Sequence, residues 1–273
     1  MLGVIIAFKE INYSDGILGS PWVGFKNFRF LFATSDAFVI TRNTLGYNTA
    51  FIIMNIIVPV SIAIALNELR NKWLPRIYQA VMLFPYFISM VVTSYLVLAL
   101  LSHNNGFFNS ALMPFLGKDP VNWYDAPVYW PFFLVAINVW KTAGYTSIIY
   151  LASLAGIDPQ LYEAIAIDGG GKWAQIRYIS IPMLRPIIIV MTLLSIGKIF
   201  NSDFGLFFQV PLQSGTLFPV TNVIDTYVYR SLILTNDLGM AAAAGFYQAI
   251  VGLILVLTTN TIVKKINPAN SLF

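Results

Sequence analysis

Five stretches of the chain are apolar for long enough to cross a membrane as helices. A helix rises about 1.5 Å per residue, so it needs about 20 residues to cross a hydrocarbon core of about 30 Å. Prolines inside these stretches, such as Pro59 and Pro85, are tolerable, since neighbouring helices can satisfy the freed backbone groups. The predicted spans cover residues 43–66, 75–101, 128–154, 187–210 and 241–263.

Residues 1–8 are also apolar but too short to cross a bilayer. They lack the basic head and the small-residue cleavage site of a signal peptide. We expect the chain to begin inside a first membrane helix whose earlier part is missing. The predicted fold is all-α: a polytopic membrane protein with five full transmembrane helices and a truncated N-terminal one, in which residues 1–273 form a single transmembrane domain.

The composition excludes a soluble protein. Hydrophobic residues make up 58% of the chain and charged residues only 10%, whereas soluble domains carry about 25% charged residues. The net charge of +4 comes from scattered residues without a basic run, which argues against nucleic-acid binding. Without cysteine and with His103 as the one histidine, the sequence offers no disulfide, thiolate site or evident metal centre.

Basic residues in three connections orient the predicted spans. The positive-inside tendency places these connections, residues 67–76, 155–186 and the C-terminal tail, on the cytoplasmic side. Five spans alternate in agreement with that choice, although four basic residues fall in the first outer segment. The cytoplasmic basic residues are Arg70, Lys72, Arg76, Lys172, Arg177, Arg185, Lys264 and Lys265.

The segment 155–186 is too polar to enter lipid and too patterned for a simple linker. Asp158 is a good N-cap, and Pro159 suits the first position of a helix. We expect a short helix here, a glycine break at 169–171, a second short helix, and a stop at Pro182.

This segment resembles the EAA loop of binding-protein-dependent ABC transporter permeases, whose pattern is Glu-Ala-Ala, two residues, Asp-Gly-Ala and later Ile-x-Leu-Pro. With the spacing kept, the chain matches at Glu163, Ala164, Asp168, Gly169, Ile179 and Pro182. It departs at Ile165 and Gly170, where the pattern has Ala, at Ile176, where Phe is usual, and at Ile181, where Leu is usual. These changes are apolar or small, so they weaken the match little.

Within that family the chain resembles carbohydrate-import permeases. Residues 1–9 and 24–28 are similar to the subgroup that handles oligosaccharides and uronate-type sugars. In those relatives a complete helix precedes the opening segment, which supports the expectation of a truncated first helix.

The resemblance implies that the segment carries a cytoplasmic coupling helix, which docks into a groove of an ATPase subunit. Glu163 then faces basic groups of that groove beside Ala164, while Asp168 and Gly169 shape the turn. The implied partners are a second permease in a heterodimer, two ATP-binding subunits and an extracytoplasmic solute-binding protein, in the bacterial inner membrane. The alternative is an ordinary cytoplasmic loop with helix caps.

No ATP-binding motif appears in the chain. Residues 169–172 read Gly-Gly-Gly-Lys, but they lack the correctly spaced first glycine, the following Ser or Thr and an upstream strand of a phosphate-binding loop. We therefore expect no catalytic residue and no cofactor on this chain, with ATP and Mg²⁺ bound by the partner subunits.

Two lysines lie inside predicted spans, where an ionisable group usually faces a cavity and has a function. Each shares a helical face with two polar neighbours, and both sets have the spacing i, i+3 and i+7. These faces flank the segment 155–186, and we expect them to converge on a hydrated pocket. The candidate substrate-binding residues are Asn138, Lys141, Tyr145, Ser195, Lys198 and Ser202.

Counted from the loop, Asn138, Lys141 and Tyr145 correspond to substrate contacts of maltose-type permeases. The corresponding positions after the loop are Ser195, Ile199 and Ser202, and their alignment needs a one-residue gap. A sugar suits them, because hydroxyls need hydrogen-bonding side chains and ring faces stack on aromatics such as Trp140 or Tyr145. The lysines suggest an anionic oligosaccharide such as a uronate. The alternative is a neutral sugar, with lysines that pair with a local acid such as Asp203 or extend to the interface.

Other classes fit less well. A membrane enzyme of lipid or polysaccharide metabolism needs a cluster of carboxylates or histidines near a membrane face, which the sequence lacks. An ion-coupled secondary transporter needs internal repeats and no ATPase partner. A permease for amino acids, peptides or inorganic anions remains an alternative within the family.

Overall fold

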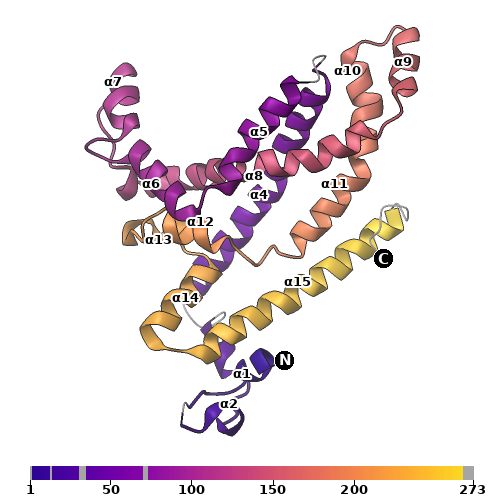
Figure 1. Ribbon diagram of the computed structural model, residues 1–273. Coiled ribbons are helices and arrows are strands. Elements are labelled where there is room, and N and C mark those ends of the chain that lie inside the picture. Colours follow the sequence, from indigo (N-terminus) through magenta and orange to yellow (C-terminus); the bar gives the residue numbers. More distant parts are fainter. Residues whose placement is uncertain (1, 13, 31–34, 70–72, 267–273) are drawn as a thin grey trace. The chain divides into compact units, whose positions relative to one another are not determined.

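The computed structural model describes residues 2–12, 14–30, 35–69 and 73–266 (Figure 1). Within these ranges the regular structure is helical, and the one isolated β-bridge joins Lys9 to Trp22. The all-α prediction is confirmed. Met1, at the start of the predicted truncated helix, and the orienting residues Arg70 and Lys72 lie outside the described residues.

Within the described residues, four continuous helices are long and apolar enough to cross a membrane, and one broken pair of helices qualifies as a further span. The polytopic membrane fold is therefore confirmed, with four spans, or five if the broken pair counts as one. The continuous spans contain α4 (Ser35–Asn67), α8 (Trp130–Ala155), α11 (Ile181–Ile196) and α15 (Leu238–Ile266), and the broken pair is α5 (Leu74–Phe87) and α6 (Met90–Leu101).

Shorter α-helices lie before and between the spans, and one of them, α10, opens the span that contains α11. They are α1 (Leu2–Ile6), α2 (Gly16–Gly19), α7 (Met113–Phe115), α9 (Pro159–Ile167), α10 (Lys172–Gln175), α12 (Phe204–Gln209), α13 (Phe218–Thr221) and α14 (Ile224–Thr235).

The first span begins earlier than its hydropathy indicates. α4 starts at Ser35 rather than near residue 43, because its polar first turns are helical too. Arg42 Nη2 and Asn43 Nδ2 both donate to the Pro219 carbonyl, at 2.8 and 3.1 Å. Polar residues at this end are thus held by protein contacts, which an apolar window does not detect.

The predicted fourth span, residues 187–210, is wrong at both ends, and Pro182 does not stop the helix. The helix runs on from α10 through a π-helical turn into α11 and ends at Ile196. In that turn the Ile181 N–H donates to the Ile176 carbonyl, a wider step than in an α-helix. The altered hydrogen-bond step comes directly before Pro182, which has no N–H to donate.

The chain forms two compact units, each assembled from three separate segments. The first unit contains Met1–Thr49, Ser89–Leu134 and Gly197–Leu255, and the second contains Ala50–Ile88, Val135–Ile196 and Val256–Phe273. Several long helices begin in one unit and end in the other. The single transmembrane domain stays a prediction.

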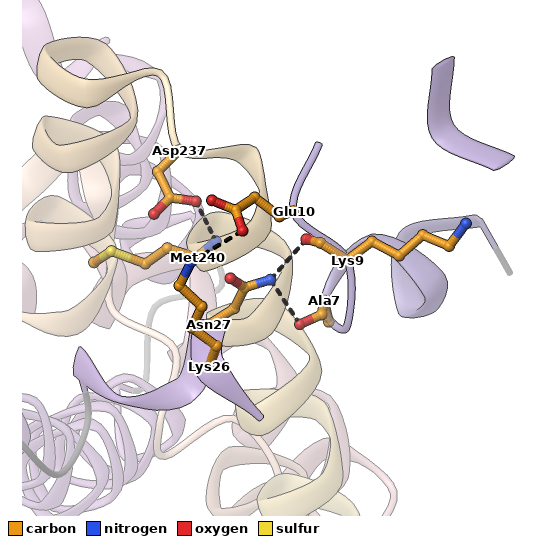
Figure 2. Close-up of polar contacts among 7 residues, drawn as sticks. All are labelled: Ala7, Lys9, Glu10, Lys26, Asn27, Asp237 and Met240. Atoms are coloured by element: carbon orange, nitrogen blue, oxygen red, sulfur yellow. Dashed lines mark hydrogen bonds and ion pairs between the residues drawn. The ribbon is translucent and has the colours of Figure 1, made fainter. Parts of the chain in front are cut away.

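In the first unit the N-terminal segment packs against α15, where Ala7, Phe28 and Ala243 form a buried cluster. Polar contacts nearby hold the segment together (Figure 2). The Asn27 side-chain amide donates to the backbone carbonyls of Ala7 and Lys9, at 3.0 and 2.9 Å. Next to it, Lys26 and Glu10 form an ion pair of 2.9 Å. Asn27 belongs to the segment 24–28 that carried the resemblance to oligosaccharide permeases, and its role here is structural.

The second unit has an apolar core where α4, α8 and α11 meet. Ala63, Tyr150 and Leu184 are fully buried there, and Leu154 is nearly so. Further along α8, Gly144 packs against the α5 backbone so closely that a Cβ at this position would lie 1.9 Å from the Met82 carbonyl oxygen. The absence of a side chain therefore sets the approach of α8 to α5.

Candidate functional site

The segment between α8 and α11 begins as the sequence predicts. Asp158 is the N-cap of α9, and its Oδ1 accepts a hydrogen bond of 2.9 Å from the Gln160 N–H. Pro159 occupies the first helical position, where its missing N–H costs nothing. These local signals were sufficient to place the start of the helix.

A Schellman turn ends α9 at the Asp-Gly-Gly sequence. Gly169 N–H donates to the Ala166 carbonyl at 3.1 Å, and Gly170 N–H donates to the Ile165 carbonyl at 2.8 Å. Gly169 has φ of 82°, a conformation that side-chain-bearing residues rarely adopt. The predicted glycine break is confirmed, and Asp168 is the C-cap residue.

Two departures from the EAA pattern are complementary. A Cβ at Gly170 would lie 2.4 Å from Ile165 Cγ2 and 2.9 Å from the Ile165 carbonyl oxygen. The larger Ile165 thus occupies the volume that an alanine at position 170 needs.

This overlap predicts a compensating pair of substitutions. Gly170→Ala is expected to destabilise the turn by about 1–3 kcal/mol, the usual cost of overpacking. Adding Ile165→Ala should recover part of the loss, because it removes the Cγ2 clash and leaves the carbonyl contact. Melting temperatures of the two single variants and the double variant in detergent give the coupling between the positions. Strictly additive effects would contradict the proposed overlap.

Polar contacts fix the rest of the segment to the second unit. Gln175 Nε2 donates to the Tyr162 carbonyl at 2.9 Å, and the Tyr162 hydroxyl lies 3.1 Å from Ser180 Oγ. Lys172 forms an ion pair of 2.7 Å with Glu68 at the end of α4. This pair brings together the two connections that the charge pattern assigns to one side of the membrane.

The outer surface of α9 is left open by this scaffold, beside α10 (Figure 1). The four predicted coupling residues, Glu163, Ala164, Asp168 and Gly169, are all exposed, and α9 buries no residue. Ile167, a large apolar side chain, is 86% exposed. The Glu163 carboxylate forms no hydrogen bond or ion pair with the described residues. The segment therefore presents a helix, capped at both ends, that combines apolar surface with an acidic group.

The predicted substrate face of α8 is engaged by neighbouring helices in the second unit. Asn138 Oδ1 accepts a hydrogen bond of 3.1 Å from Asn55 Nδ2, and the Thr142 hydroxyl donates a hydrogen bond of 2.9 Å to Asn55 Oδ1. The Tyr145 ring stacks on Tyr86 with centroids 4.4 Å apart and an interplanar angle of 9°. Both rings remain partly exposed, so they retain surface for another ligand.

Lys141 is bound to backbone carbonyls at the end of α5. Its Nζ donates to Pro85 O at 3.1 Å and to Ile88 O, and the residue is only 6% exposed. The last carbonyls of a helix have no intrahelical partner, and a nearby cation stabilises them. The sequence indicated a functional lysine but not these partners, which lie 56 and 53 residues away in the chain.

The second predicted face divides between the two units. Ser195, in the second unit, donates from Oγ to the Met191 carbonyl of its own helix at 2.8 Å. Lys198 and Ser202 belong to the first unit, and Lys198 is exposed. Asp203 caps α12, and its Oδ1 accepts a hydrogen bond of 3.0 Å from the Leu206 N–H. Within the described residues, Asp203 forms no ion pair with Lys198. Convergence of the two predicted faces stays a prediction.

A polar site in the first unit was not predicted. Asp225 and Gln248 line a cavity of about 330 Å³ together with the rings of Phe204 and Tyr229. Asp225 Oδ2 accepts a hydrogen bond of 2.7 Å from the Ser202 N–H, and the Asp225 carboxylate also accepts from Gln248 Nε2 at 3.3 Å. Burial raises the pKa of the Asp225 carboxyl above its usual value, against the opposing effect of these hydrogen bonds. The signal available was a single acid at a helix start, which is common at the first turn for structural reasons.

Comparison with known proteins adds a family match over most of the chain. The family described as "Binding-protein-dependent transport system inner membrane component" matches residues 55–269. The polygalacturonan/rhamnogalacturonan transport system permease protein YteP of Bacillus subtilis (strain 168) is 34% identical over 266 residues, which cover 97% of this chain and 82% of that protein.

Two solved structures are similar to the whole fold. One is a bacterial ABC transporter involved in the import of the acidic polysaccharide alginate, with a TM-score of 0.87 and 30% identity over 98% of this chain and 89% of that chain. The other is a bacterial alginate ABC transporter in complex with an alginate pentasaccharide-bound periplasmic protein, with a TM-score of 0.83 and 30% identity over 89% and 83% of the two chains.

Proposed function

Since the chain belongs to the family of binding-protein-dependent transport system inner membrane components, we propose that it is a permease subunit of an ATP-driven oligosaccharide importer. As a member of this family it is a transport component and a multi-pass protein of the bacterial inner membrane. The observation that carries the importer mechanism is α9, a capped helix that buries no residue and whose Glu163 carboxylate forms no hydrogen bond or ion pair within the described residues.

We assign ATP hydrolysis to two partner subunits that hold ATP and Mg²⁺, with no cofactor on this chain. ATP-driven closure of that pair moves α9, with Glu163 and Ala164 in contact with the ATPase groove and with Asp168 and Gly169 fixing the turn. A second permease completes the translocation path. Alternating access then results from rigid-body movement of the two permeases.

The substrate class is an anionic oligosaccharide handed over by an extracytoplasmic solute-binding protein. In support, two similar transporters handle acidic polysaccharides by their names, and one solved complex contains a periplasmic protein loaded with a pentasaccharide. On this chain, the two lysines in or beside the apolar spans supply positive charge for carboxylates, and the Tyr145 and Tyr86 rings supply a stacking surface.

We assign substrate contact to Asn138, Lys141 and Tyr145 on α8 and to Ser195, Lys198 and Ser202 beyond the coupling segment. Their side chains supply donors and acceptors for hydroxyls, and the two ammonium groups supply charge-assisted bonds to carboxylates.

Uptake by the reconstituted transporter tests this proposal. Vesicles holding the complete complex receive radiolabelled uronate trisaccharide or its carboxyl-reduced, neutral counterpart. Lys141→Met and Lys198→Met are each expected to lower uptake of the uronate about tenfold, because a hydrogen bond to a charged group is worth about 1.5–3 kcal/mol. Lys265→Met, at the far end of α15, is the matched control and should transport normally.

Two results decide between the parts of the proposal. Normal uronate uptake by both variants contradicts the charge pairing, and equal uptake of the neutral trisaccharide assigns the importer to neutral sugars. Absence of uptake of either saccharide by the wild-type complex contradicts the saccharide importer itself.

A further inference from the structure

Three contacts from one face of α8 hold the C-terminal turn of α5. Lys141 binds the carbonyls of Pro85 and Ile88, Gly144 packs against the Met82 carbonyl, and Tyr145 stacks on Tyr86. We call these contacts the α5 clamp. They follow one another along α8 at spacings of three and one residues, so one helical face makes all of them.

The clamp lies at a break in a span. α5 ends at Phe87, Ile88 is its C-cap with extended ψ of 131°, and α6 starts anew with Ser89 as its N-cap. Ile88 is also the last residue of a second-unit segment, and Ser89 is the first residue of a first-unit segment. The clamp therefore holds the end of α5 directly before this break, by contacts within the second unit.

Lys141 is the contact that a ligand can exchange. The Gly144 packing is fixed by backbone atoms, and the two tyrosine rings offer partly exposed faces without having to separate. The Lys141 ammonium, in contrast, donates hydrogen bonds to uncharged backbone carbonyls. A carboxylate adds the attraction of opposite charges to its hydrogen bond with the ammonium, so an acidic ligand competes effectively with a neutral carbonyl.

We propose that Lys141 is a positioning residue that holds the end of α5 until the carboxylate of an arriving saccharide takes over its ammonium. The inference rests on the proposed function and deepens it, because selection for acid groups and release of the broken span become one event. A neutral sugar offers only uncharged oxygens, which have no charge advantage over the carbonyls, so it leaves the clamp closed. Lys265, exposed at the far end of α15, serves as the comparison lysine.

Spin labelling tests this inference directly, since the chain has no cysteine of its own. Phe87, 74% exposed at the end of α5, is replaced by Cys and labelled in the complete reconstituted complex. Phe84→Cys, one turn earlier and 65% exposed, is the control label. Spectra are recorded without substrate, with binding protein and uronate trisaccharide, and with its carboxyl-reduced counterpart.

The wild-type label at position 87 should be immobile without substrate, become mobile with the uronate and stay immobile with the neutral trisaccharide. Lys141→Met should make it mobile in all three conditions, and Lys265→Met, the control variant of the uptake assay, should behave as wild type. The label at position 84 should not respond in any of them.

An immobile label in Lys141→Met, or an unchanged wild-type spectrum while uronate uptake proceeds, overturns the inference. The substrate-free comparison of wild type with Lys141→Met needs no transport. It therefore tests whether Lys141 holds the end of α5 even if the complex imports no saccharide. The uptake assay shows separately whether the proposed function fails.

Discussion

Glu163→Lys is expected to lower ATP-driven uptake about 100-fold while the protein remains folded in the membrane. The carboxylate is exposed and makes no hydrogen bond or ion pair within the described residues, so its replacement removes no intramolecular contact. At a basic groove of an ATPase partner, a like charge costs several kcal/mol, and about 3 kcal/mol corresponds to about 100-fold. Uptake in vesicles and co-purification of the ATPase subunits measure the two consequences.

Matched variants separate the position of the charge from its sign. Glu163→Gln, which removes the charge without reversing it, should give an intermediate loss. Asp119→Lys makes the same charge reversal on an exposed residue of the predicted outer side and should leave coupling unchanged. Normal uptake by Glu163→Lys would refute the assignment of α9 as the coupling helix.

Gly144→Ala should destabilise the protein by about 3 kcal/mol or more, at the upper end of the range for overpacked cores. The added Cβ meets the Met82 carbonyl oxygen at 1.9 Å and its carbon at 2.4 Å, and both belong to backbone that cannot rotate away. α8 must therefore move off α5, which also disturbs the Lys141 contacts. Yield of monodisperse protein and melting temperature in detergent measure the effect.

Gly46→Ala is the control for this substitution. Gly46 also lies inside a span helix, but a Cβ there meets nothing within 4 Å. Because alanine favours a helix over glycine by about 1 kcal/mol, this variant should be neutral or slightly more stable. A similar loss in both variants would mean that the close approach of α8 to α5 is not the cause.

The parts of the fold that sequence predicts well are those fixed by neighbouring residues. Long apolar runs indicated the spans, and Asp158, Pro159 and Gly169 placed both ends of α9, because caps and turns depend on a few adjacent groups. Pro182 was misread, since its effect depends on the π-helical turn before it, which no simple pattern announces.

Long-range contacts were beyond the sequence. Lys141 was identified as a costly residue in a span, but its carbonyl partners lie more than 50 residues away and carry no side-chain signature. Asp225 was missed for a related reason. Its cavity needs Gln248 and Phe204 from helices that the sequence does not place beside it.

The fit between Ile165 and Gly170 also bears on how this loop diverged from the Ala-and-Ala form of the EAA pattern. A chain that acquired Ile165 first would have carried an overlapping pair, whereas a chain that acquired Gly170 first would have carried only an unfilled space. Small gaps in a surface turn are tolerated more readily than overlaps with backbone. Glycine before isoleucine is therefore the order of substitution that avoids an overlapping intermediate.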